Sequence, residues 1–207
     1  STLHGTSLPG HDDTDTMGVC IEPPGYVIGL RQFEQHIHRD QPAGVRSSPG
    51  DTDSVIYSLR KYLRLALKGN PTILLLLFAP KEFILYQHSF GRSLQEMAPH
   101  IVSRQVAAPY LGYMKAQHER LIGIRGQKRV RRPELDEQFG YDTKYAGHII
   151  RLGFQGVEIL RSGRLTLPMP DKERDTVLQV RTGKFPLNDV LTLSGELQAT
   201  IRDSEQT

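Results

Sequence analysis

The sequence has no tryptophan and only one cysteine, Cys20, among its 207 residues. A single cysteine excludes an internal disulfide framework and is compatible with a reducing, cytoplasmic environment. We expect Cys20 to be a small residue of a strand rather than a nucleophile. Long apolar runs are missing as well: the longest, residues 73–79, is far shorter than the ~20 residues of a membrane-spanning helix. The start of the chain carries no basic segment followed by an apolar stretch, which argues against a secretory signal peptide and for cytoplasmic localisation.

The composition is that of a folded globular protein, with 38% hydrophobic and 24% charged residues. The net charge is only +3, but the basic residues are unevenly distributed. One glycine-containing stretch holds a cluster of them: Arg125, Lys128, Arg129, Arg131 and Arg132. Such a run is more often a solvated loop. The alternative is a site for phosphate groups or nucleic acid, which basic clusters bind through counterion release.

The first quarter of the chain, residues 1–55, is rich in Gly, Pro, Asp and Thr. Short β-friendly runs occur there at residues 15–22, 33–38 and 53–57, and proline- and glycine-containing breaks separate them. This pattern predicts a small sheet of hairpin-connected strands.

From Ser58 onward the hydrophobic pattern is helical. Apolar side chains recur at helical spacing at Leu59, Tyr62, Leu63 and Ala66. Gly69 and Pro71 then predict the end of this helix. Further helices are predicted at residues 71–78, 87–98, 105–121, 142–161, 171–181 and 186–202.

Together these patterns predict an α+β fold, in which a small mixed β-sheet core is followed by a mostly helical C-terminal part. We place the core at residues 1–86 and a helical domain that completes the active-site cleft at residues 87–207.

The most informative segment contains two aspartates, Asp13 and Asp15, on a run that is expected to become a strand. Strand side chains alternate, so both carboxylates would project from the same face. Like charges held this close repel each other unless a cation lies between them, and hard oxygen ligands suit Mg²⁺. The alternative is a hydrophilic turn in which the aspartates only cap the backbone.

A third carboxylate, Asp53, lies where a predicted strand runs into the helix after Ser58. Adjacent strands could place Asp53 beside the pair formed by Asp13 and Asp15. Asp53 could instead cap the N-terminus of that helix, a role for which Ser58 is the other candidate. Asp51 is an alternative to Asp53 as the third carboxylate.

These residues resemble a known family. Residues 1–5 (Ser-Thr-Leu-His-Gly), followed by Asp13-Thr14-Asp15, resemble the Gly-Ser turn and paired aspartates of DNA polymerase β superfamily nucleotidyltransferases. A branch of predicted bacterial and phage nucleotidyltransferases is more similar still. In that branch a third Asp precedes a Leu-Arg-Lys helix that ends in Asn-Pro, as Asp53 here precedes residues 59–61 and 69–71.

The resemblance continues through residues 132–135 (Arg-Pro-Glu-Leu) and 140–148 (Gly-Tyr-Asp-Thr-Lys-Tyr-Ala-Gly-His), and so extends to about residue 170. One difference is that the family turn begins with Gly before Ser, whereas this sequence begins at Ser1. We therefore expect the nucleotidyltransferase core at residues 1–86 to be N-terminally incomplete.

The resemblance implies a two-metal nucleotidyltransferase that moves a nucleoside monophosphate from an NTP, ATP among them, to an acceptor hydroxyl and releases pyrophosphate. Ser1 would help to hold the triphosphate. Asp13 and Asp15 would ligate one or two Mg²⁺ ions, with Mn²⁺ as an alternative. Asp53 would complete the second metal site and orient the acceptor. The acceptor stays open among RNA, a protein and a small molecule, and no membrane partner is expected.

The predicted helix at residues 142–161 carries polar side chains at spacings of three and four, which places them on one face: Lys144, His148, Arg151, Gln155 and Glu158. Its other faces are apolar and contain three glycines that permit close helix packing: Gly147, Gly153 and Gly156. We predict that Lys144 and Arg151 contact the phosphates, with His148 in a secondary role and His4 contributing from the phosphate turn. A solvent-exposed polar face is the alternative.

Two functions from different classes fit the sequence. The first is metal-dependent nucleotidyl transfer. The second is a catalytically silent nucleotide- or partner-binding module, such as an antitoxin-like or regulatory relative. Retention of Asp13, Asp15 and Asp53 favours the enzyme, because a silent relative has no chemical need for these carboxylates.

Overall fold

The computed structural model describes residues 2–8, 14–42, 50–124 and 132–206. Within these residues the sheet has three strands, β1 (Thr14–Cys20), β2 (Gln35–Arg39) and β3 (Thr52–Ser58), in the order β1-β3-β2. β3 pairs with β1 in parallel and with β2 in antiparallel fashion. The sheet is therefore mixed, as predicted, but the hairpin-type pairing holds only for β2 and β3. β1 instead crosses over to lie beside β3, and this brings together two segments that are distant in sequence.

Helix α2 (Leu59–Leu67) follows β3 directly, and α3 (Pro71–Phe78) follows after a tight turn. The Ser58 side chain caps α2 by accepting a hydrogen bond from Lys61 N at 3.2 Å. Gly69 makes the turn with φ of +71°, and a Cβ on it would lie 2.7 Å from Val106 Cα. Only glycine fits this position for both reasons. Asn70 then caps α3, accepting from the backbone N–H groups of its first turn.

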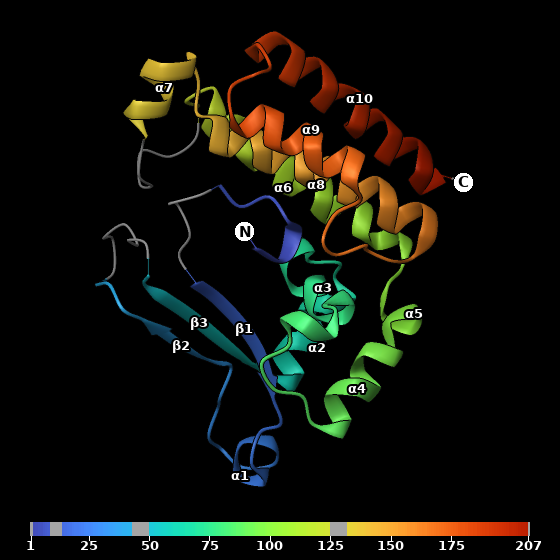
Figure 1. The fold of residues 1–207 in the computed structure, drawn as a ribbon. Coiled ribbons are helices and arrows are strands. Elements are labelled where there is room, and N and C mark those ends of the chain that lie inside the picture. The colour runs from blue at the N-terminus through green and yellow to red at the C-terminus, as the bar shows by residue number, and fades with distance from the viewer. Residues whose placement is uncertain (1, 9–13, 43–49, 125–131, 207) are drawn as a thin grey trace.

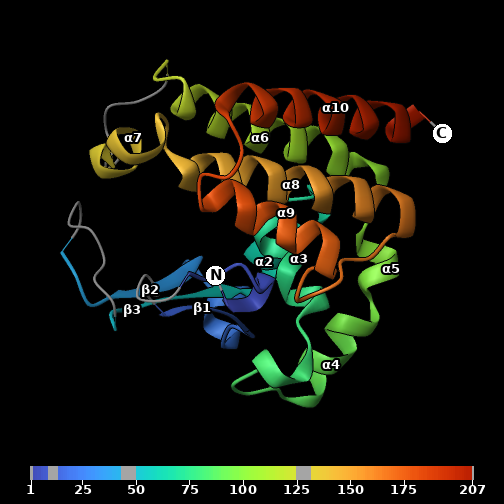
Figure 2. The same ribbon diagram turned by 45° about the horizontal axis from the view of Figure 1, so that its top comes forward.

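Long helices form a layer above the sheet, consisting of α6 (Ala107–Leu121), α8 (Thr143–Ser162), α9 (Asp171–Arg181) and α10 (Leu187–Gln206). Figures 1 and 2 show α8 at the centre of this layer, where it packs against α6, α9 and α10. The buried residues before and after the predicted boundary near residue 86 form one hydrophobic core. None of the helices in the described part of the chain is long and apolar enough to cross a membrane.

Short elements connect these layers: the 3₁₀ turns η1 (Thr2–His4), η2 (Lys81–Phe83) and η3 (Arg104–Val106), and the helices α1 (Pro24–Val27), α4 (Ser89–Glu96), α5 (Ala98–Ile101) and α7 (Pro133–Phe139). The helix predicted at residues 87–98 corresponds to α4, whereas α5, which begins only at Ala98, was not predicted. Pro99 lies in the first turn of α5, where proline is tolerated because its missing N–H would have no helical partner. The sequence interpretation missed α1 and α7.

Two glycines of α8 allow close helix packing, as predicted. A Cβ on Gly153 would lie 2.6 Å from Leu197 Cδ1 of α10, and one on Gly156 would lie 2.7 Å from Ile201 Cδ1. The third, Gly147, meets a different partner: a Cβ on it would lie 2.5 Å from Arg181 Cγ of α9.

We expect Gly153→Ala to lower the free energy of unfolding by about 1–3 kcal/mol, because the added methyl group overpacks the contact with α10. Gly195→Ala is the matched control on α10, where a Cβ would meet nothing within 4 Å. It should raise the free energy of unfolding by up to about 1 kcal/mol through helix propensity. Urea unfolding of both variants measures the difference, and equal stabilisation by the two alanines would contradict the close packing of α8 and α10.

Candidate active site

The register of β1 and β3 places Asp15 level with Asp53. The two strands are parallel neighbours, so the two side chains leave the same face of the sheet about 5 Å apart at the backbone. Met17 and Val19, which share the alternation of Asp15, pack against the hydrophobic core, so this face is the one turned towards the helices. The structure therefore brings together Asp15 and Asp53, as the sequence interpretation expected.

Asp53 lies inside β3 and does not cap α2, because Ser58 has that role. Asp51 lies just before the strand and shares the alternation of Asp53. Asp13 lies outside the described residues, and within them no group of three metal-ligating side chains gathers. The two carboxylates in register are hard oxygen donors whose charges repel, and this donor set fits Mg²⁺ or Mn²⁺.

Strands β1 and β3 begin on the side of the molecule where α7 lies (Figures 1 and 2).

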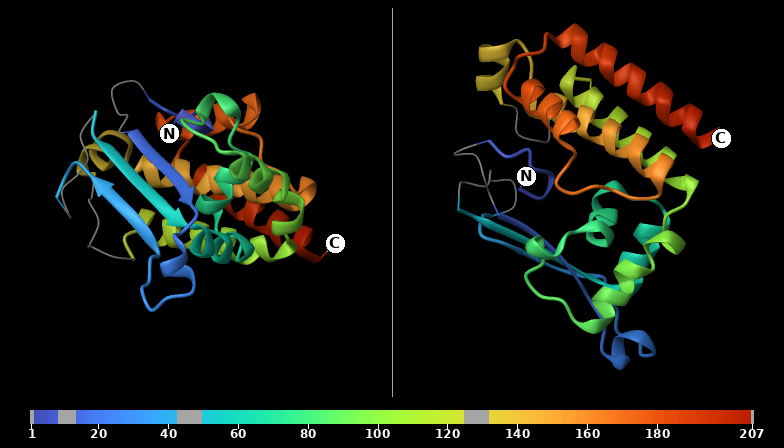
Figure 3. Two further views of the ribbon diagram at one scale, coloured as in Figure 1. Left: turned by 90° about the horizontal axis from the view of Figure 1, so that it is seen from below. Right: turned by 45° about the vertical axis from the view of Figure 1, so that its right-hand side comes forward.

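The N-terminal segment, residues 2–8, lies between the sheet and helices α8 and α9 (Figures 1 and 3). Gly5 ends the η1 turn with φ of +70°. The backbone N–H of Met169 donates to His4 O at 3.2 Å, which fixes this segment to the loop before α9.

The His4 side chain is buried between two residues of α8. Its Nε2 lies 2.6 Å from Arg151 Nη1, and its Nδ1 lies 3.1 Å from Gln155 Nε2. Arg151 Nη1 also donates to Gln155 Oε1 at 3.2 Å. The structure thus joins His4 to Arg151, two predicted site residues that are 147 positions apart in the sequence. Ser1, the other predicted residue of this segment, lies outside the described residues.

The cluster of His4, Arg151 and Gln155 is rich in donors. A guanidinium only donates, an amide has one acceptor oxygen, and a neutral imidazole has one acceptor nitrogen. The three side chains therefore offer more N–H groups than acceptors, and an anionic oxygen would supply acceptors that they lack. Burial lowers the pKa of Arg151 to about 10, so this residue is still a cation at neutral pH.

His148 lies one turn before Arg151 on α8, among a group of cations: Arg132, Lys144, Arg151 and Arg181. Burial lowers the pKa of His148 well below its ordinary value, and the repulsion of these cations lowers it further. Burial and the charge of Arg151 do the same to the pKa of His4. Both histidines are therefore neutral at pH 7, and the positive potential at this face of α8 comes from Lys144 and the arginines.

Arg132, from the basic run, has a structural role. It forms an ion pair with Asp142 at 3.1 Å and lies over the Tyr145 ring at 5.3 Å from the centroid. Asp142 in turn caps α8 by accepting from the backbone N–H of Lys144 at 2.9 Å. The rest of the run, residues 125–131, lies outside the described part of the chain.

The predicted polar face of α8 divides into two parts. Lys144, His148, Arg151 and Gln155 belong to the cationic cluster, whereas Glu158 accepts two hydrogen bonds from Thr166 and holds the loop after α8. The structure also adds a residue that the sequence interpretation missed, Arg181 of α9, which donates to Thr6 O. No local pattern marks Arg181, because its partners lie on other elements.

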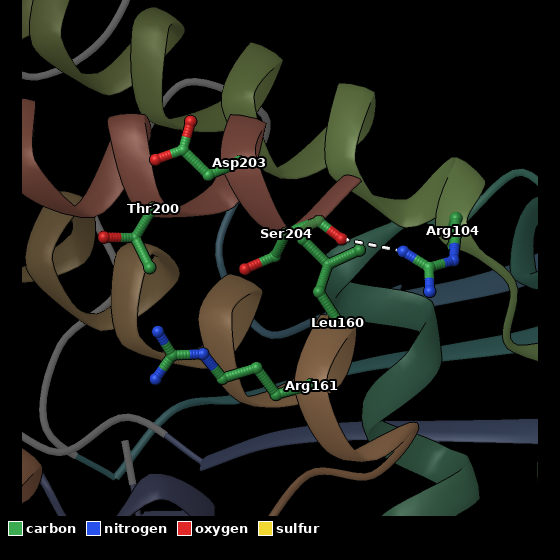
Figure 4. Close-up of a pocket in the computed structure, with 6 residues that line it drawn as sticks. All are labelled: Arg104, Leu160, Arg161, Thr200, Asp203 and Ser204. Atoms are coloured by element: carbon green, nitrogen blue, oxygen red, sulfur yellow. Dashed lines mark hydrogen bonds between the residues drawn. The ribbon is translucent and has the colours of Figure 1, made fainter. Parts of the chain in front are cut away.

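A separate hollow of about 500 Å³ lies towards the C-terminal ends of α8 and α10 (Figure 4). Its lining consists of Arg104, Leu160, Arg161, Thr200, Asp203 and Ser204. Among these residues, Arg104 Nη1 donates a hydrogen bond to Ser204 O at 2.9 Å. None of the predicted site residues contributes to this hollow, so it is distinct from the carboxylates and the cationic cluster.

A mixed sheet with level aspartates, followed by helices that carry cations, is what the resemblance to polymerase-β-type nucleotidyltransferases led us to expect. Comparison with known families agrees: residues 1–200 match the family described as "RNA repair pathway DNA polymerase beta family", RlaP. The chain belongs to this family, which is of the nucleotidyltransferase type.

Among curated proteins, the chain is 24% identical over 131 residues to an uncharacterized 38.9 kDa protein from the nrdC–mobD intergenic region of Enterobacteria phage T4. The matched segment covers 62% of this chain and 38% of the phage protein. The comparison with solved structures gives no match.

Proposed function

We propose that this protein transfers a nucleoside monophosphate from an NTP to an acceptor hydroxyl and releases pyrophosphate. The observation that carries the proposal is the register that places Asp15 level with Asp53 on parallel strands. Two carboxylates at the same level, on the face turned towards the helices, are suited to binding divalent cations. Membership of a nucleotidyltransferase-type family supports this role for them.

In the proposed reaction the acceptor hydroxyl loses its proton to water as its oxygen attacks the α-phosphorus, the bond from this phosphorus to the bridging oxygen breaks, and pyrophosphate leaves. Asp15 and Asp53, together with Asp13, would hold Mg²⁺ or Mn²⁺, which neutralises charge on the attacking and leaving oxygens. Asp53 would also orient the acceptor hydroxyl. The work of the protein is then positioning and electrostatic stabilisation.

The triphosphate would lie against the cationic face of α8. Arg151 and Lys144 would bind its oxygens, Arg151 with the planar geometry that suits bidentate phosphate contact. Ser1 and the backbone N–H groups of the N-terminal segment would hold the same phosphates from the other side. Neutral His148 would donate a hydrogen bond without adding charge.

We further propose that the acceptor is the terminal hydroxyl of an RNA, because the family description places its members in an RNA repair pathway. The other basic residues of the run, Arg125, Lys128, Arg129 and Arg131, would then contact the RNA backbone, with release of its counterions. A protein or small-molecule acceptor is the competing outcome of the test.

The test is to incubate the protein with each of the four labelled NTPs, with Mg²⁺, Mn²⁺ or EDTA, and with or without a single-stranded RNA. We expect pyrophosphate release that needs both the metal and the RNA, and an RNA that gains the mass of one nucleotide. Label on the protein itself would make a protein hydroxyl the acceptor. NTP binding without pyrophosphate release under any of these conditions would instead favour the catalytically silent binding module.

A further inference from the structure

We propose that Arg181 is a positioning residue that holds the phosphate-binding N-terminal segment against α8 through a slot made by Gly147. This inference rests on the proposed function, because it assigns residues 2–8 to triphosphate binding. Arg181 is the last residue of α9, and its Nη1 donates to the backbone oxygen of Thr6. Thr6 itself is buried, so this contact lies inside the protein rather than at its surface.

Gly147 lets the Arg181 side chain reach Thr6. A Cβ at position 147 would lie 2.5 Å from Cγ and 3.1 Å from Cδ of Arg181. Any larger residue there would displace the side chain along its length, not only at its flexible tip. A glycine in the middle of a helix weakens that helix, and Gly153 and Gly156 are explained by contacts with apolar side chains. Gly147 differs because the side chain that needs its space is an arginine.

The same segment is held a second time two residues earlier, where His4 contacts Arg151 and Gln155. Between these points Gly5 has φ of +70°, and a Cβ on it would lie 2.8 Å from Arg174 Cδ and 3.1 Å from Pro168 Cβ. The segment is therefore enclosed by α8, α9 and the loop that precedes α9.

Two arginines from different helices thus fix one turn of backbone, Arg151 through His4 and Arg181 through Thr6. The position of this turn sets where its N–H groups meet a phosphate relative to the cations of α8. Arg181 acts through the backbone of the turn, so we assign it a positioning role and leave direct phosphate contact to Arg151 and Lys144. Loss of Arg181 and loss of its slot should have the same effect on phosphate binding.

Calorimetry with inorganic tripolyphosphate and Mg²⁺ tests this inference without reference to the base or to the acceptor. We expect Arg181→Ala and Gly147→Ala each to weaken binding about tenfold, the value of one hydrogen bond to a charged group. The double variant should be no weaker than Arg181→Ala alone, because both changes remove one contact. Arg181→Lys, which keeps a charged donor, should recover part of the affinity when position 147 is glycine and none when it is alanine.

Gly153→Ala is the control, since it destabilises α8 without touching the N-terminal segment. It should bind tripolyphosphate within about twofold of wild type. An equal loss in Gly153→Ala would overturn the inference, because binding would then follow the stability of α8. Additive losses in the double variant would overturn it as well, as would wild-type affinity in Arg181→Ala. No binding by the wild-type protein would overturn the proposed phosphate site itself, and this inference with it.

Discussion

Asp53→Asn should lower the rate of nucleotidyl transfer at least about 100-fold, because charge stabilisation by a bound metal is worth several kcal/mol and each ~1.4 kcal/mol is a factor of ten. Asparagine keeps the size of the side chain but removes the negative charge that would bind Mg²⁺ beside Asp15. Pyrophosphate release with the preferred NTP and acceptor measures the effect.

The same substitution should not weaken the fold when metal is absent. Asp15 and Asp53 are level on neighbouring strands, so their charges repel each other in the metal-free protein. We therefore expect the melting temperature of Asp53→Asn in EDTA to equal or exceed that of wild type. Mg²⁺ should raise the melting temperature of wild type, through preferential binding to the folded state, and should raise that of the variant much less.

Asp51→Asn is the matched control, because Asp51 carries the same charge two residues earlier and lies outside β3. It should keep most of the activity. Full activity in Asp53→Asn, with loss in Asp51→Asn, would exchange the roles of the two residues. Full activity in both variants would remove this strand from the proposed metal site.

Local signals were enough to predict most of the helices. Caps and breaks such as Ser58, Gly69 and Pro71 depend on neighbours within a few residues, and the helix predicted at 171–181 agrees with α9 at both ends. The same type of signal was present for α7, which begins at Pro133 and ends before Gly140 with φ of +79°. The sequence interpretation nevertheless missed this helix.

The sheet shows where local reasoning fails. The three strands were predicted, but which strand lies beside which is decided by contacts between distant segments. The parallel pairing of β1 with β3 is the feature that brings Asp15 and Asp53 together, and no periodicity within either strand specifies it. The strand pattern left the placement of Asp53 beside Asp15 as one of two alternatives, and the resemblance to a known family favoured it.

In the candidate site, too, local patterns predicted some features, whereas others depend on contacts between distant segments. Spacings of three and four on α8 correctly placed Lys144, His148 and Arg151 on one face, because helix geometry alone sets this relation. The sequence did not reveal that His4 would be buried against that face, or that Arg181 would cross it at Gly147. Both are contacts between elements that are distant in the sequence. The sequence gives a sign only of the second contact, at Gly147, and the role of this glycine is clear only when Arg181 is seen beside it.

Arg151→Met should weaken NTP binding about 10- to 100-fold, since a charge-assisted hydrogen bond contributes roughly 1.5–3 kcal/mol. Methionine preserves much of the length and apolar volume of the side chain but removes its donors and its charge. Arg161→Met is the control, because Arg161 lies on the same helix at the separate hollow and its substitution changes the net charge equally. It should leave NTP binding close to that of wild type.

Salt dependence separates a direct contact from a general loss of positive potential. Arg151 is a cation at neutral pH although burial lowers its pKa to about 10. The logarithm of the wild-type binding constant should therefore fall with rising salt concentration, and the slope should be smaller for Arg151→Met. For Arg161→Met the slope should match wild type. Wild-type affinity and slope in Arg151→Met would show that the triphosphate does not bind at the cationic face of α8, whereas equal losses in both variants would attribute binding to net charge alone.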